Sequence, residues 1–148
     1  MSTYTQLIYQ LVFGPENRQK CLIKENRDEL FKYITGILKE CKCHIYQING
    51  VEDHLHIVTH IHPSIAISTL VKNIKVASNN FIKDNGLFPK FRNWQEGYAA
   101  FSYSYNEKSR LIEYVRNQEL HHSKISYRDE LINLLNEFGV SYDEKYLL

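Results

Sequence analysis

Two histidines separated by one residue are the first candidates for chemistry in this sequence. His54 and His56 lie in the run EDHLHIV (52–58), which alternates as a β-strand does. Side chains two apart on a strand point to the same face, so both imidazoles would lie within reach of one metal ion. Imidazole is a common ligand of divalent transition ions. The alternative is a chance pair, because the chain contains seven histidines.

A tyrosine and a glutamine further along the chain form a second candidate pair. Tyr114 and Gln118 are four residues apart in a segment with helical periodicity, so their side chains would lie one turn apart on the same face. A phenol can act as a nucleophile, and an amide oxygen can bind a metal ion. The alternative reading is ordinary packing for Tyr114, which borders the apolar positions 111, 112 and 115, and solvent exposure for Gln118.

The first half of the chain supplies the elements that must position the histidines. The β-branched and aromatic run 4–13 predicts a strand that Gly14-Pro15 ends, and the apolar periodicity of 24–41 predicts a helix. Two further strands, 43–48 and 54–61, flank Asn49-Gly50, a dipeptide that favours a tight hairpin turn. We therefore expect the histidine pair at the start of a strand, next to this turn.

The second half predicts helices around one more strand. A helix should begin at Pro63 or Ser64 and run to about residue 84, followed by a strand over 98–105. A third helix, begun at Asn106 or Ser109, should reach residue 120, and a fourth should span 127–138. The order of elements predicts an α+β sandwich of the ferredoxin-like or RRM-like type, with a mainly antiparallel sheet and the tyrosine on a helix of the C-terminal half.

Composition sets the broad class of protein. With 148 residues, of which 43% are apolar and 24% charged, the chain should form one domain over residues 1–148. The sequence shows no apolar run long enough for a membrane span and no export signal, which predicts a cytoplasmic protein without a membrane partner. The three cysteines lack metal-site spacing and favour neither a disulfide framework nor a zinc site.

Charge is distributed unevenly, although the net charge is only +1. Residues 72–92 contain five basic side chains and one acidic one, whereas residues 129–148 contain one basic and five acidic ones. A nucleic acid would therefore meet the middle of the chain. The alternatives are a solvated helix face and an anchored loop. The candidate DNA contacts are Lys72, Lys75, Lys90, Arg92 and Trp94.

Three motifs taken together resemble one family. The segment DHLHI after a hairpin, the loop WQEGYAAFSYS and the helix EYVRNQELHH occur in the order seen in the single-tyrosine HUH transposases of the insertion sequence 200/605 group and their REP-associated relatives. The resemblance extends over nearly the whole chain. It makes a metal site at the histidine pair much more plausible than a chance pair.

The resemblance assigns roles to individual residues. His54, His56 and Gln118 match the family's metal ligands, and Tyr114 matches its nucleophile. The cofactor would be Mg²⁺ or Mn²⁺, and two imidazoles with an amide favour Mn²⁺ on chemical grounds. Asp53 could orient a ligand histidine, although on a regular strand it would point to the other face, and capping of the turn fits it better. His121 and His122 are interpreted as cations at a helix end.

The implied activity is a DNA transposase that nicks and rejoins single-stranded, hairpin-bearing ends of a mobile element. Tyr114 would form a 5′-phosphotyrosyl intermediate without ATP or another nucleotide cofactor. The family suggests a homodimer with possible composite active sites, so Tyr114 could act in its own subunit or in the partner. The alternatives are a non-catalytic RRM-like nucleic-acid-binding protein and a metal-dependent nuclease that uses activated water.

Overall fold

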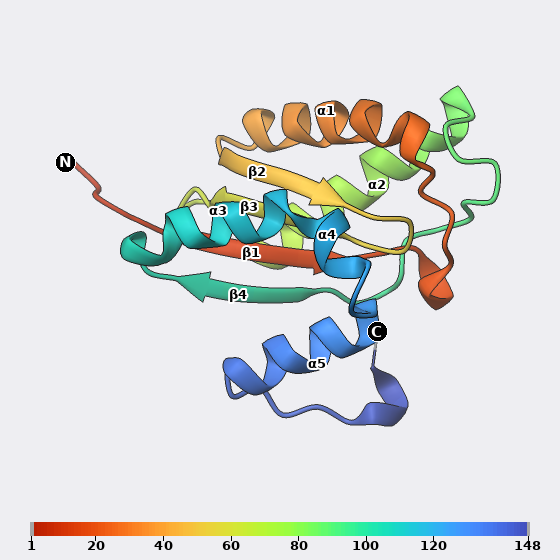
Figure 1. Ribbon diagram of the computed structural model, residues 1–148. Helices are drawn as coiled ribbons and strands as arrows, with labels where there is room; N and C mark the ends of the chain where they lie inside the picture. The colour runs from red at the N-terminus through yellow and green to blue at the C-terminus, as the bar shows by residue number, and fades with distance from the viewer. Residues whose placement is uncertain (1, 148) are drawn as a thin grey trace.

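A four-stranded antiparallel sheet lies at the centre of the computed structural model, which describes residues 2–147 (Figure 1). The strand order is β2-β3-β1-β4. The strands span Ile8–Phe13 (β1), His44–Gly50 (β2), Leu55–His60 (β3) and Ala99–Tyr103 (β4). Because β1 pairs with both β3 and β4, it occupies the interior of the sheet. Its register places Val12 opposite His56, which fixes where that histidine lies.

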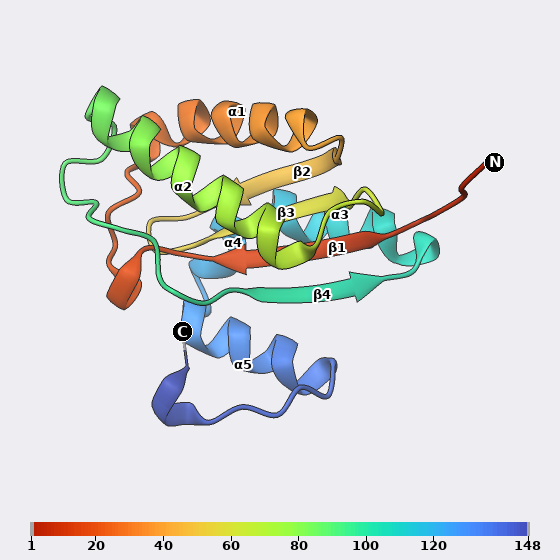
Figure 2. The same cartoon turned by 180° about the vertical axis from the view of Figure 1, so that it is seen from behind.

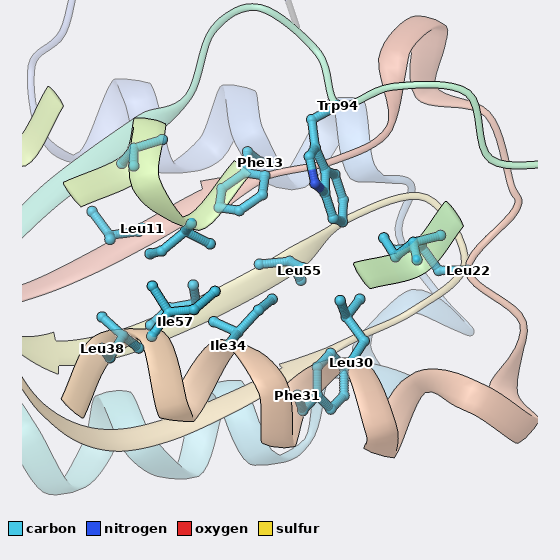
Figure 3. Packing of buried hydrophobic residues seen from close by; sticks show 14 of the residues in the cluster. Leu11, Phe13, Leu22, Leu30, Phe31, Ile34, Leu38, Leu55, Ile57 and Trp94 are labelled. Atoms are coloured by element: carbon cyan, nitrogen blue, oxygen red, sulfur yellow. The ribbon is translucent and has the colours of Figure 1, made fainter. Parts of the chain in front are cut away.

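Two long helices cover one face of the sheet. Helices α1 (Lys24–Glu40) and α2 (Ile67–Asn85) lie side by side there (Figure 2). Leu30 and Ile34 of α1 meet Leu11 and Ile57 of the sheet in the main hydrophobic core (Figure 3). Burial of each such side chain contributes about 1.5–3 kcal/mol, so this layer supplies much of the driving force for folding.

Three shorter helices lie toward the other face. They are α3 (Lys108–Arg116), α4 (Gln118–His122) and α5 (Tyr127–Glu137). Helix α3 packs through Leu111 and Val115 against Ile8 and Val58. Helix α5 packs near β1 and β4, in a cluster whose members are Val12, Ala99, Phe101, Tyr127, Leu131, Leu134 and Leu135. The order of strands and helices confirms the predicted α+β fold of ferredoxin-like type.

The predicted turn at Asn49-Gly50 is wrong, because both residues belong to β2. They pair with His56 and Leu55, and the chain turns over 51–54 instead. Asn49 Nδ2 donates a hydrogen bond to the Arg116 carbonyl at 2.9 Å, so its side chain binds the end of α3. A Cβ on Gly50 would lie only 2.6 Å from the His54 carbonyl oxygen. The backbone of the turn approaches Gly50 so closely that this position requires glycine.

Two predicted helices differ from the observed ones. Helix α2 begins at Ile67 because 62–65 form a turn in which the Ser64 amide donates to His62 Nδ1 at 3.1 Å. The third helix is interrupted at Asn117, where φ is −96° and ψ is 23°, and α4 then begins at Gln118. Tyr114 and Gln118 therefore lie on successive helices, although the Asn117 amide still bonds to the Glu113 carbonyl.

Within residues 2–147, no helix combines the length and apolar character that a membrane span requires.

Candidate metal centre and nucleophile

The two histidines of the HxH motif lie between the sheet and the second helical layer. His56 is on β3 and lies next to Tyr114 of α3 and Glu130 of α5, whereas His54 belongs to the turn just before that strand. Both side chains are fully buried. Their rings lie 5.1 Å apart between centroids, so the structure brings them to one site as the spacing predicted.

A buried glutamate is the centre of this site. One carboxylate oxygen of Glu130, on α5, contacts the Nε2 atoms of His54 at 3.1 Å, His56 at 2.9 Å and His122 at 3.0 Å. The four side chains offer ligand atoms that all lie within 4.8 Å of one another. His122 therefore belongs to the site, and its interpretation as a helix-end cation is corrected.

The opposite nitrogen of each histidine faces a hydrogen-bond acceptor. In each case Nδ1 lies 2.6–2.8 Å from an oxygen of an ionised carboxylate, a side-chain amide or a backbone carbonyl, and none of these oxygens carries a hydrogen. These oxygens are Asp53 Oδ1 for His54, Gln10 Oε1 for His56 and the Ile125 carbonyl for His122. An N–H at each Nδ1 would satisfy these acceptors, and in a neutral ring it leaves the Nε2 lone pair directed at Glu130.

This arrangement fits a divalent cation. Neutral imidazole lone pairs and an ionised carboxylate directed at one point repel one another unless a cation lies among them. Three nitrogens and one oxygen form a donor set suited to a transition ion such as Mn²⁺. Gln118 Oε1 is also buried and has no hydrogen-bond partner within the described part of the chain. The Gln118 side chain, which contacts Glu130 through its Nε2, could thus offer one more oxygen ligand to an ion at the cluster.

The predicted nucleophile shares the same carboxylate. The Tyr114 hydroxyl donates a hydrogen bond to Glu130 Oε2, and Gln118 Nε2 donates to the same atom at 3.1 Å. The ring of Tyr114 lies 4.6 Å from that of His121 and 6.1 Å from that of His56, measured between centroids. The structure therefore brings all four predicted site residues together, despite the break after α3.

Burial and charge set the proton affinities of the site. Burial lowers the pKa of His56. Burial also opposes charge on His54, but contacts with Asp53 and Glu130 outweigh that effect and raise its pKa. The pKa of Glu130 is lowered because its contacts with the histidines overcome burial. Burial and the Glu130 charge both raise the pKa of Tyr114, so the phenol is protonated in this state.

The turn that carries His54 is held from two sides. A Cβ on Gly14 would lie 2.2 Å from the Asp53 carbonyl oxygen, so only glycine permits this contact. Tyr127 stacks on His54, with ring centroids 4.0 Å apart and planes 4° from parallel. Gln95 accepts hydrogen bonds from the Gly14 amide at 3.0 Å and from the Tyr127 hydroxyl at 3.3 Å. Capping of the turn was the favoured role for Asp53, but its Oδ1 lies 2.7 Å from His54 Nδ1. The contact is possible because residue 53 lies in a turn and not on a strand, so an orienting role stays a prediction.

Residues 3–118 match the family model described as "Transposase IS200 like". The chain belongs to the IS200-like transposase family. The match contains Tyr114 and the HxH motif but ends before His122 and Glu130.

Solved structures share the fold of this IS200-like transposase at low sequence identity. A candidate transposase from Deinococcus radiodurans R1 aligns with a TM-score of 0.62 and 20% identity, over 80% of this chain and 95% of that one. A REP-associated tyrosine transposase bound to a REP hairpin aligns with a TM-score of 0.61 and 17% identity, over 84% of this chain and 76% of that one. No curated protein matches the sequence.

The residues predicted to contact DNA lie in different environments in this transposase. Trp94 is 7% exposed and donates from Nε1 to Ser78 Oγ at 2.9 Å, so it anchors its loop in the core. Lys75 donates to the carbonyls of Gln95 and Gly97 at 2.7 and 2.8 Å. These environments oppose stacking by Trp94 and phosphate binding by Lys75. Contacts from the remaining three stay predictions: Lys72, Lys90 and Arg92 are exposed.

Three residues of the site were not predicted as site residues from the sequence. Glu130 could have been noticed, because it lies at helical spacing among the apolar positions of α5, where a carboxylate is unusual. His122 carried a weaker signal, as part of the HH pair after the tyrosine motif. Gln10 lies on the face of β1 that points toward His56. Nothing in the sequence marked it as a site residue, since a glutamine in a strand is ordinary.

Proposed function

We propose that this IS200-like transposase nicks single-stranded DNA and transfers the cut strand through a covalent bond to Tyr114. The observation that carries the proposal is the shared carboxylate: Glu130 contacts the Tyr114 hydroxyl through one oxygen and three histidines through the other. A nucleophile and a candidate cation site are thereby held on opposite sides of one group.

The proposed reaction needs few groups. The Tyr114 oxygen bonds to the phosphorus, and the bond from phosphorus to the 3′ oxygen breaks, leaving a 5′-phosphotyrosine and a free 3′ hydroxyl. His54 and His56, with Gln118, would hold Mg²⁺ or Mn²⁺, which when bound polarises the phosphodiester and stabilises added negative charge. Glu130 Oε2 is placed to receive the phenolic proton. Attack by another 3′ hydroxyl then rejoins the strand.

An open cleft leads to the nucleophile. It has a volume of about 490 Å³, lies between α3 and α5, and is lined by Tyr103, Arg110, Tyr114 and His121 among others. Aromatic rings stack on bases and a guanidinium pairs with phosphate, so these residues suit a single strand, whereas the carboxylates of Glu107 and Glu137, which also line the cleft, would repel its phosphates. Since the REP-associated neighbour is described with a bound REP hairpin, we propose hairpin-bearing ends as the substrate.

We further propose that Tyr114 acts on the site of its own chain. The tyrosine and the histidines meet within one subunit in this structure. A homodimer stays a prediction, and its active sites need no exchange of helices to be complete.

The experiment uses a labelled single strand that carries the hairpin-forming sequence flanking the coding region. With Mg²⁺ or Mn²⁺ we expect a denaturation-resistant adduct of protein and DNA, and no adduct in Tyr114→Phe. An adduct that persists in Tyr114→Phe would refute the proposal. Cleavage without an adduct would favour a nuclease that activates water, and binding without cleavage would favour an RRM-like binding protein.

A further inference from the structure

The carboxylate of Glu130 touches both halves of the site and comes from a segment beyond the family match. Its Oε1 contacts three imidazole nitrogens, and its Oε2 contacts the Tyr114 hydroxyl and the Gln118 amide. We propose that Glu130 bridges the two halves, with Oε1 as a ligand of the divalent ion and Oε2 holding the nucleophile, and that His122 is a further ligand. The bridging half of this inference rests on the proposed function of Tyr114.

The number of N–H groups on the three histidines distinguishes a metal site from a simple ion pair. A neutral imidazole has one N–H, and in His54, His56 and His122 it is used at Nδ1. The contacts of Nε2 with Glu130 could be hydrogen bonds only if all three rings were imidazolium. Three imidazolium rings with the carboxylates of Glu130 and Asp53 would leave one net positive charge in a buried site, which is costly, whereas a divalent ion with neutral rings and the same two carboxylates would leave none. A single divalent ion satisfies the same lone pairs.

The donor set also bears on which ion is bound. Mg²⁺ prefers oxygen ligands in octahedral geometry and keeps much of its water. Three imidazole nitrogens and one carboxylate oxygen favour a transition ion over Mg²⁺. We therefore expect Mn²⁺ to bind more tightly than Mg²⁺, with Glu130 and His122 as part of the reason.

Helix α5 holds Glu130 rigidly enough for both roles. The Ser126 side chain caps the helix by accepting a hydrogen bond from the Asp129 amide at 3.1 Å. Tyr127, three residues before Glu130 and about one turn away on the same buried side, stacks on His54. Leu131 and Leu134 are buried in the cluster with Val12. Docking of α5 thus sets the position of the carboxylate relative to the sheet.

The first test measures Mn²⁺ affinity by calorimetry on the full-length protein. Glu130→Gln keeps the shape of the side chain, and His122→Gln removes the other ligand. We expect the Kd for Mn²⁺ to rise by roughly 10–100-fold in each, the loss typical of damaged metal sites. Asp129→Asn is the matched control, since it removes the same charge from the neighbouring exposed position, and it should change Kd by less than about twofold.

Wild-type affinity in both Glu130→Gln and His122→Gln would overturn the ligand assignment, as would a wild-type protein that binds no Mn²⁺. If Glu130→Gln fails to fold, His122→Gln alone decides whether the segment after residue 118 contributes a ligand. Circular dichroism of each variant establishes which case applies.

The second test separates bridging from ligation. At saturating Mn²⁺, we expect adduct formation to recover in His122→Gln but not in Glu130→Gln, because only Glu130 also holds Tyr114. Full recovery in Glu130→Gln would overturn the bridging role. Tyr114→Phe should lose the adduct yet bind Mn²⁺ within about twofold of the wild type.

The two proposals can fail separately. If Mn²⁺ binding depends on Glu130 but the wild type forms no adduct, the ligand assignment stands and the proposed function fails. If the adduct depends on Tyr114 but Glu130→Gln binds Mn²⁺ normally, the proposed function stands and this inference fails.

Discussion

The two faces of the central sheet are built from the same strands but carry different chemistry. On β1, Leu11 and Phe13 face α1 and α2, whereas Gln10 and Val12 face the other side. On β3, Ile57 belongs to the first face and His56 to the second. Alternation along a strand thus separates an apolar core from a polar site by a single residue.

The difference shows how one sheet can serve stability and chemistry together. The first face is a continuous apolar cluster that needs no partner groups. The second face buries Gln10, His54, His56, Gln118 and Glu130, and such groups are tolerated only where they satisfy one another. A substitution in the apolar cluster of the first face should therefore damage folding, and one at these buried polar groups should damage activity.

The largest effect is expected on the polar face. His56→Ala removes a ligand whose imidazole is fixed by Gln10, so cleavage and adduct formation should fall by at least about 10²-fold. Hairpin affinity, measured in the same buffer, should change little because it depends on phosphate contacts and stacking. Equal loss of binding and cleavage would show that the two faces are not functionally separate.

The apolar face should show the opposite pattern. Ile34→Ala truncates a fully buried side chain of α1 and should lower the free energy of unfolding by about 2–5 kcal/mol. Adduct formation per folded molecule should stay at the wild-type level below the melting transition. Denaturant unfolding and the adduct assay on the same sample test this, and a selective loss of activity would contradict it.

A glycine between the core and the site should affect both properties. Gly14→Ala places a methyl group against the Asp53 carbonyl, which forces the turn carrying His54 to move. We expect a loss of about 1–3 kcal/mol in unfolding free energy, as for overpacked sites, together with weaker Mn²⁺ binding. Gly36→Ala is the control, because a Cβ there meets nothing within 4 Å. Unchanged Mn²⁺ affinity in Gly14→Ala would show that the turn tolerates the shift.

The smallest effect concerns DNA binding at the surface. Arg110 lines the cleft beside Tyr114, whereas Lys72 lies on α2 in the layer that covers the opposite face. Arg110→Ala should reduce the slope of log affinity against log salt concentration by about 1, and Lys72→Ala should leave it unchanged. The reverse result would place the DNA on the α1 and α2 side, as the sequence-based prediction for Lys72 has it.

The sequence by itself determined the local elements and half of the site. Periodicity predicted the strands and most of the helix limits, and the spacings HxH and YxxxQ identified His54, His56, Tyr114 and Gln118. These features are encoded locally, because the side-chain directions of strands and helices follow from backbone geometry. The same reasoning misplaced the turn after β2, since Asn49 binds the end of α3, a contact that no local pattern encodes.

Only the tertiary structure decided what lies at the centre of the site. Glu130 is 74 residues from His56 along the chain, and they meet because the apolar side of α5 packs near β1 and β4. His122 joins them through the break at Asn117 that begins α4. A carboxylate and a third imidazole reach the histidine pair through long-range packing, which sequence spacing does not record.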